Sequence, residues 1–168
     1  MRKKKMLFIY NPCAGKGAMK SKLSDVMETF MRADYEVTVY ATQREREATE
    51  LVMELGEKYD RIVCSGGDGT MNEVANGMMR LHEKPICGYI PAGTVNDFAS
   101  SLRIPKIMRH AAELVTQGKV FRCDLGSFND KFFTYVAGFG AFTEVSYTTP
   151  QEWKNMLGKT AYFIEGLK

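Results

Sequence analysis

Short apolar runs alternate with longer amphipathic segments over the first two thirds of the chain. The runs predict buried strands at residues 6–10, 37–40, 62–64 and 86–90. The segments between them predict one helix that ends near residue 32, and further helices at 45–58, 71–80, 96–102 and 106–116. Repeated strand–helix units indicate a parallel sheet with helices on both faces.

The pattern changes after about residue 120. Residues 120–128, 131–137 and 144–147 are strand-like, and Asn129-Asp130 is typical of a hairpin turn. We therefore expect a three-layer α/β fold with a mostly parallel sheet, followed by the beginning of a β-rich second domain. The expected boundary separates residues 1–128 from residues 129–168.

The stretch Ser65-Gly66-Gly67-Asp68-Gly69-Thr70 lies between a predicted strand and a predicted helix. Its glycines allow close approach of a ligand to the backbone and positive φ angles. The start of a helix offers free N–H groups to phosphate, and a carboxylate beside phosphate implies a metal ion between the two charges. The stretch predicts a site for nucleotide phosphate and Mg²⁺. The alternative is an ordinary strand–turn–helix connection.

The helix after the glycine loop carries an apolar stripe at helical spacing, which indicates a face packed on the sheet. The stripe consists of Met71, Val74, Ala75, Met78 and Met79. Thr70 is the predicted N-cap, because its hydroxyl suits the free N–H groups of a first turn.

Two further loops follow the first and fourth predicted strands, at 11–17 and 91–97. The carboxyl ends of parallel strands share one edge of a sheet, so we expect these loops to meet the glycine loop there. Lys16 is a candidate for neutralising phosphate charge, with an ordinary surface lysine as the alternative. Thr94, Asn96 and Asp97 offer oxygen groups to phosphate or metal-bound water, and helix capping is the alternative role for Asp97.

Composition narrows the class of protein. The chain has 168 residues, the size of one domain or of one domain and a piece of another. A net charge of +3 is too small to indicate nucleic-acid binding. The basic cluster at 2–5 suits either anionic lipid or plain solvent exposure. No transmembrane segment is expected, because the apolar run at 6–10 is too short.

Four cysteines are widely spaced, at positions 13, 64, 87 and 123, without a CxxC pair. That spacing disfavours a zinc site and is typical of a reduced, cytosolic protein.

Three spaced motifs resemble the signatures of the diacylglycerol kinase catalytic-domain family. They are Asn11-Pro12-Cys13-Ala14-Gly15, the stretch from Gly66 to Glu73, and the stretch from Pro91 to Phe98. Within this family, the chain is most similar to the bacterial soluble lipid kinases of the diacylglycerol kinase B and YegS type. Phosphofructokinases and NAD kinases share only the Gly-Gly-Asp-Gly element.

The resemblance implies a phosphofructokinase-like α/β domain that binds nucleotide and a β-rich domain that binds lipid, with the active cleft between them. ATP contacts would fall on Asn11, Pro12, Cys13, Ala14, Gly15, Lys16, Thr42, Gly66, Gly67, Asp68, Gly69, Thr70, Met71, Asn72 and Thr94. Asp68, Asp97 and Asp124 match the aspartates of a water-linked Mg²⁺ network, and residues 138–145 match a segment near the lipid cleft.

The implied activity is transfer of the γ-phosphoryl group of ATP to a lipid hydroxyl, with diacylglycerol as the favoured acceptor. Members of the family are longer than this chain, and their general base lies in the additional part. We therefore expect residues 1–168 to be the nucleotide-binding part and to be inactive alone.

The resemblance also implies a cytoplasmic protein, peripheral to the inner face of the membrane, and leaves a homodimer open. Two alternatives remain. They are an NAD kinase-like enzyme and a non-catalytic nucleotide-binding module.

Overall fold

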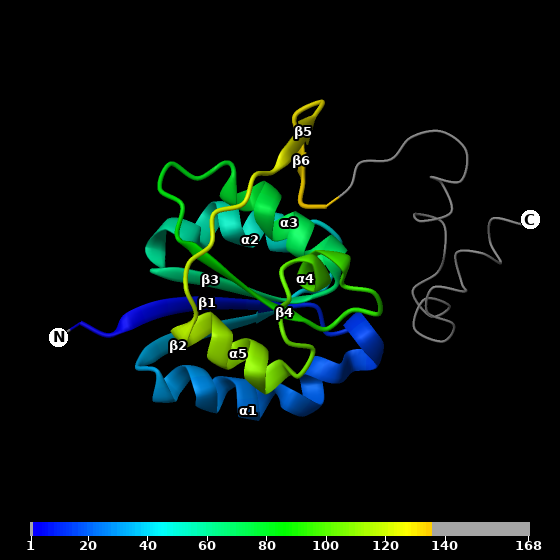
Figure 1. Cartoon of the computed structure of the whole chain (residues 1–168). Helices are drawn as coiled ribbons and strands as arrows, with labels where there is room; N and C mark the ends of the chain where they lie inside the picture. The colour runs from blue at the N-terminus through cyan, green and yellow to red at the C-terminus, as the bar shows by residue number, and fades with distance from the viewer. Residues whose placement is uncertain (1, 136–168) are drawn as a thin grey trace, which may run out of the picture.

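In the computed structural model, residues 2–135 are described, and they form a parallel sheet between two layers of helices (Figure 1). The strands are β1 Lys4–Tyr10, β2 Tyr35–Ala41, β3 Arg61–Gly66 and β4 Ile86–Pro91. All neighbouring strands pair in parallel, in the order β2-β1-β3-β4. The expected α/β fold is confirmed.

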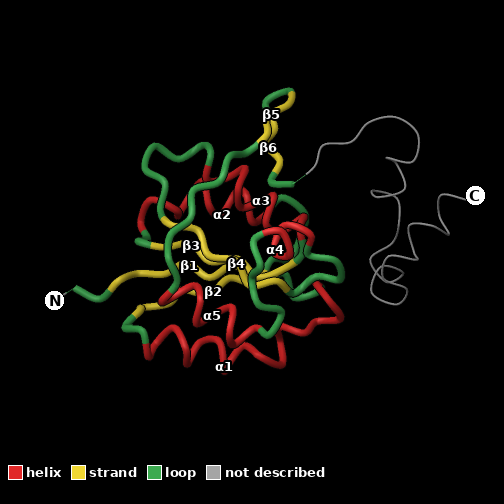
Figure 2. The backbone as a smooth tube through the Cα atoms, viewed as in Figure 1, coloured by secondary structure: helices red, strands yellow, loops and turns green. Residues whose placement is uncertain are grey.

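The helices divide between the two faces of the sheet, as Figures 1 and 2 show. Helices α1 and α5 cover one face, and α2, α3 and α4 pack on the other. Their bounds are α1 Ala18–Arg32, α2 Glu47–Leu55, α3 Asp68–Met78, α4 Asp97–Ser101 and α5 Met108–Gln117. Short 3₁₀ turns precede α1 at Ala14–Gly17 and follow α2 at Gly56–Lys58.

Strand β1 lies in the middle of the core. Met6 and Phe8 face α1 and α5, while Leu7 and Ile9 face α2 and α3, and all four side chains are fully buried. A strand buried on both faces reads as a continuous apolar run, which is why residues 6–10 are recognisable in the sequence.

Helix α3 begins three residues earlier than the sequence pattern predicts. Its N-cap is Gly67, and the N–H of Met71 already donates to the carbonyl of Gly67 at 3.1 Å. Thr70 is therefore a buried residue of the first turn, and its assignment as the N-cap is wrong.

A two-stranded antiparallel hairpin follows α5, with β5 at Gly126–Phe128 and β6 at Lys131–Phe133. Asn129 and Asp130 both have positive φ, 46° and 60°, as a tight hairpin turn requires. The predicted hairpin is confirmed, but its strands are shorter than expected, and residues 119–125 form no strand.

The expected domain boundary at 128/129 falls at the turn of this hairpin and stays a prediction. The expected strand at 144–147 and the segment 138–145 lie outside the described residues. Over residues 2–135, no helix is long and apolar enough to cross a membrane.

Candidate functional site

Backbone hydrogen bonds join the three predicted loops at the carboxyl edge of the sheet. The N–H of Asn11 donates to the carbonyl of Ser65 at 2.9 Å. On the other side of β3, the N–H groups of Ala92 and Gly93 donate to the carbonyl of Gly66, at 2.8 and 3.1 Å. The end of β3 thus holds loops 11–17 and 91–97 on its two sides, as the parallel topology predicts.

Close packing explains two glycines of the β3 and β4 loops. A Cβ on Gly93 would lie 2.5 Å from the Cα of Gly67, and a Cβ on Gly66 would overlap the side chain of Thr70. Positive φ angles were expected in this glycine loop, but Gly67 has a φ of −90°. That expectation is wrong, because the loop runs directly from an extended strand into a helix.

Positive φ angles occur instead in loop 11–17, at Gly15 (53°), Lys16 (62°) and Gly17 (74°). A Cβ on Gly15 would overlap the carbonyl oxygen of Ala92, so this glycine also allows loop 11–17 to pack on loop 91–97. The side-chain oxygen of Asn11 accepts a 2.8 Å bond from the N–H of Cys13 and shapes the start of the loop.

The carboxylate of Asp68 joins the glycine loop to α4. Its Oδ1 accepts the N–H of Phe98 at 3.0 Å, and its Oδ2 accepts the N–H of Asp97 at 3.1 Å. These N–H groups belong to the first turn of α4, where a helix has no donors of its own to satisfy them and a negative charge is stabilising. Asp68 therefore caps α4, and the alternative role of Asp97 as the cap of its own helix is wrong.

Asn96 closes loop 91–97 around Gly93. Its side-chain oxygen accepts the N–H of Gly93 at 2.9 Å, and its amide nitrogen donates to the carbonyl of Gly93 at 2.7 Å. Asn96 has a φ of 58°, in the left-handed region that asparagine tolerates better than most residues.

Sequence reasoning missed Tyr89 of β4. Its hydroxyl lies 3.2 Å from the carbonyl oxygen of Gly66 and 3.4 Å from Oδ1 of Asn96, so it donates at the junction of both loops. Burial raises the pKa of Tyr89 well above its usual value, with smaller contributions from Cys64 and the charge of Asp68. The phenol therefore stays a neutral donor. Its position on a buried strand gave no sign of a polar role.

Ser65 is the first residue of the stretch predicted to bind phosphate, but no role was predicted for its side chain. It is fully buried at the end of β3, and its hydroxyl has no hydrogen-bond partner among the described residues. Its position beside Gly66 offered a signal, because a polar residue stands there at the end of an apolar strand.

Three residues of the predicted nucleotide set have side chains that face the core: Ala14, Thr70 and Met71 are each no more than 8% exposed. Contacts from these residues would be made by their backbone. Gly69, in contrast, is exposed, and a Cβ placed on it would meet nothing within 4 Å.

The remaining predicted residues differ in their surroundings. The N–H of Thr42 donates to the carbonyl of Tyr10 at 3.0 Å, beside β1. Pro12 is half-buried, whereas Cys13, Lys16 and Thr94 are exposed around the same edge.

Asn72 turns its side-chain oxygen toward the N–H of Thr134, at 3.3 Å. The nucleotide contact implied for Asn72 stays a prediction.

The three aspartates assigned to magnesium are not gathered into one ligand set. Asp68 and Asp97 are adjacent, whereas Asp124 is exposed in the segment before β5. Among residues 2–135, no three His, Cys, Asp or Glu side chains lie close enough together to hold a metal directly. The predicted network is water-linked and stays a prediction.

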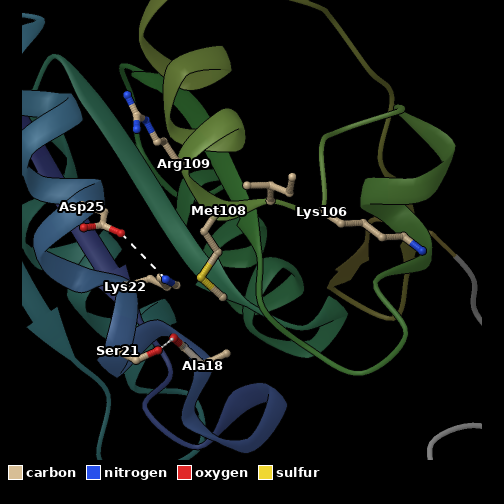
Figure 3. A pocket seen from close by; sticks show the side chains of 8 residues that line it. Ala18, Ser21, Lys22, Asp25, Lys106, Met108 and Arg109 are labelled. Carbon is tan, nitrogen blue, oxygen red and sulfur yellow. Dashed lines mark hydrogen bonds and ion pairs between the residues drawn. The ribbon is translucent and has the colours of Figure 1, made fainter.

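A cavity of about 480 Å³ lies away from these loops, between the first turns of α1 and α5 (Figure 3). Lys22 and Asp25 line it and lie 3.9 Å apart, and residues 106–109 line its other side. None of the predicted site residues lines this cavity.

Comparison with known proteins agrees with the arrangement of the loops. The family described as "Diacylglycerol kinase catalytic domain" matches residues 5–128. A diacylglycerol kinase of Staphylococcus saprophyticus is 39% identical over 167 residues, which cover 99% of this chain and 55% of that protein. One from Staphylococcus haemolyticus is 42% identical over 161 residues, covering 95% of this chain and 49% of that protein.

A crystal structure of a diacylglycerol kinase from Bacillus anthracis superposes with a TM-score of 0.70 at 33% identity. The match covers 79% of this chain and 46% of the Bacillus chain. This chain spans about half the length of the curated relatives it matches. The three joined loops, the profile match and the similarity over almost the whole chain lead to one conclusion: the chain belongs to the diacylglycerol kinase catalytic-domain family.

Proposed function

We propose that the carboxyl edge of the sheet binds ATP with Mg²⁺ for phosphoryl transfer to a lipid hydroxyl. Diacylglycerol is the proposed acceptor and phosphatidic acid the product. The observation that carries the proposal is the position of Asp68, which starts α3 on the glycine loop and holds the start of α4.

Phosphate fits at the start of α3. The first-turn N–H groups of Asp68, Gly69 and Thr70 have no intrahelical partner, and the surface beside Gly69 is open. Lys16 lies exposed on the neighbouring loop and would add a positive charge. We assign these groups to the phosphates of ATP.

Asp68 also fits a divalent cation. Each of its oxygens accepts one backbone N–H and keeps a lone pair for a cation or its bound water. Mg²⁺ supplies charge neutralisation between the carboxylate and the phosphates. The hydrogen bonds from α4 fix the orientation of this carboxylate, so no rearrangement is needed before the transfer.

Phosphoryl transfer is mostly a matter of position and charge, and the structure supports both requirements. The bonds from loops 11–17 and 91–97 to the end of β3 fix the residues proposed to contact the nucleotide relative to one another. The proposed setting is the inner membrane surface, where the lipid acceptor lies, with the protein on the cytoplasmic side.

Two measurements test the proposal on the full-length protein that contains residues 1–168, because this chain spans about half the length of its relatives. Titration calorimetry should detect ATP binding that requires Mg²⁺, and radiolabelled ATP should label diacylglycerol in mixed micelles. Transfer to NAD in place of lipid would support the NAD kinase alternative. Binding of ATP without transfer to either acceptor would support a non-catalytic module and overturn the kinase proposal.

A further inference from the structure

Helix α3 carries a polar stripe, Asp68, Asn72 and Asn76, at intervals of four residues. Residues with this spacing lie above one another on one side of a helix. Asp68 binds the start of α4, as described above. The two asparagines are half-buried and bind a different part of the chain, namely strand β6, which packs beside α3 (Figure 1), and Thr134, which directly follows it.

The asparagines bind the backbone of this segment both as donors and as acceptors. Asn76 donates its amide nitrogen to the carbonyl of Phe132 at 2.7 Å and accepts the N–H of Phe132 at 3.0 Å. The oxygen of Asn72 accepts the N–H of Thr134 at 3.3 Å. A further 2.8 Å bond from the Asn76 amide to the carbonyl of Asn72 orients the Asn76 side chain.

The geometry of the two elements explains why this pairing works. Four residues of helix rise about 6 Å, and two residues of strand rise about 6.6–6.8 Å. Asn72 and Asn76 therefore match Thr134 and Phe132 in antiparallel order. Successive strand residues point their N–H and C=O groups to opposite edges, so Phe132 and Thr134 turn theirs away from β5 and toward α3. The side chains of Asn72 and Asn76 thus make the hydrogen bonds that a neighbouring strand would make to this edge of the hairpin.

We propose that Asn76, assisted by Asn72, is a positioning residue that fixes the hairpin β5–β6 to the helix on which the phosphate site is built. The catalytic part of this inference rests on the proposed function. Asn76 and Asp68 are eight residues apart on one rigid helix, about 12 Å by the helix rise. The hairpin is thereby held in register with the proposed phosphate site.

This role predicts a particular kinetic signature. Asn76 touches none of the proposed nucleotide contacts except through Asn72, so its loss should leave ATP affinity unchanged. Loss of Asn76 should instead lower kcat, because it frees the hairpin at which the expected lipid-binding domain begins. A displacement of about 1 Å between the reacting groups can reduce the rate of transfer about 100-fold. A residue that only stabilised the fold would reduce the amount of active protein and leave the kcat of the folded fraction unchanged.

The test compares Asn76→Ala with Arg80→Ala in the full-length protein that contains residues 1–168. Arg80 is exposed just beyond the C-terminal end of α3, and its one side-chain hydrogen bond within residues 2–135 goes to the carbonyl of Asn76, so it is the matched control. Hydrogen exchange of the Phe132 and Thr134 amides reports the pairing directly. We expect at least 10-fold faster exchange in Asn76→Ala and wild-type rates in Arg80→Ala.

The activity measurement uses ATP and diacylglycerol micelles. We expect the kcat of Asn76→Ala to fall 10- to 100-fold, with the Kd for Mg²⁺–ATP within twofold of wild type. If Asn76→Ala does not fold, Asn76→Asp takes its place. The aspartate has the same shape and keeps the acceptor for Phe132, but it sets an oxygen against the Phe132 carbonyl, so the same two effects are expected.

Unchanged exchange at Phe132 and Thr134 would overturn the pairing. Faster exchange with unchanged kcat would overturn the positioning role. A wild-type protein that transfers no phosphate to lipid would overturn the proposed function instead, and the exchange rates would then decide the pairing by themselves.

Discussion

The carboxylate of Asp68 accepts a 3.0 Å hydrogen bond from the backbone N–H of Phe98, thirty residues later in the chain. This bond joins the start of α3 to the start of α4, so one side chain fixes two of the three loops at the proposed nucleotide site. Asp68 therefore has a structural role that is independent of any ligand, and the two roles can be measured separately.

Replacement of Asp68 by Asn should abolish activity and also weaken the fold. An amide has one acceptor oxygen, so one of the N–H groups of Asp97 and Phe98 would face another donor. We expect phosphoryl transfer to fall about 100-fold or more. Without nucleotide or metal, we expect the free energy of unfolding to fall by about 1–3 kcal/mol.

Denaturant unfolding and labelled-phosphate transfer check these two effects. Asp25→Asn is the control, because Asp25 is an exposed carboxylate on α1, remote from the three loops. Full activity of the Asp68→Asn variant would contradict the proposed metal role, whatever its stability.

Substitutions of Gly93 and Gly69 by alanine should affect the stability of the fold and the binding of nucleotide separately. A Cβ on Gly93 would meet the Cα of Gly67 at 2.5 Å, which forces the backbone of two loops apart. We expect Gly93→Ala to lower the free energy of unfolding by about 1–3 kcal/mol. A Cβ on Gly69 meets nothing, and alanine suits a helix better than glycine, so Gly69→Ala should be neutral or stabilising by up to about 1 kcal/mol.

The same methyl group on Gly69 would nevertheless occupy the space proposed for phosphate. We expect Gly69→Ala to weaken Mg²⁺–ATP binding in calorimetry while its thermal midpoint is unchanged or raised. Wild-type affinity in this variant would place the phosphates elsewhere on the sheet edge.

The sequence predicts the sheet because β1, β3 and β4 are buried on both faces and so form apolar runs that are visible without a structure. It also predicts that three loops meet, because parallel strands present their carboxyl ends at one edge. What it cannot predict is which distant backbone group a side chain will bind. Asp68, Asn72 and Asn76 are plainly polar helix residues, but their partners follow 29 to 62 residues later.

The start of α3 shows the same limit at short range. Thr70 is a good N-cap by residue type, yet the cap position falls on Gly67. Strand β3 runs to Gly66 and α3 starts at Asp68, whose carboxylate is held by the N–H groups of Asp97 and Phe98. Tertiary contact overrides the local preference.

The hairpin turn offers a substitution that should stabilise the protein. Asn129 and Asp130 both have positive φ, and the second position of such a turn favours glycine. We expect Asp130→Gly to slow hydrogen exchange across the Gly126–Phe133 pair, since the left-handed backbone is less strained. Faster exchange would show that the added freedom of glycine in the unfolded chain outweighs the relief of strain.

Tyr89→Phe should weaken the junction between the glycine loop and loop 91–97. The substitution removes the phenol donor, while the carbonyl of Gly66 and Oδ1 of Asn96 keep their bonds from backbone N–H groups. We expect the free energy of unfolding to fall by about 0.5–1.5 kcal/mol at neutral pH, the net value of one hydrogen bond. The ring itself stays packed, so denaturant unfolding should remain cooperative.

The pH dependence of that difference identifies the hydroxyl as its cause. The pKa of Tyr89 is raised in the folded protein, mainly by burial, so above about pH 10 the unfolded chain loses this proton while the folded chain keeps it. The folded state then binds more protons, and the stability of the wild type should fall with rising pH. The contribution of Tyr89 approaches about 1.4 kcal/mol per pH unit.

Tyr89→Phe lacks this proton and should show a correspondingly shallower decline, so the two unfolding curves should converge between about pH 10 and pH 11. Denaturant unfolding at half-unit steps from pH 8 to pH 11 measures the difference. A constant difference in the free energy of unfolding between wild type and variant over that range would mean that Tyr89 ionises as readily in the folded protein as in the unfolded chain. The phenol would then not be the buried, neutral donor that holds the two loops together.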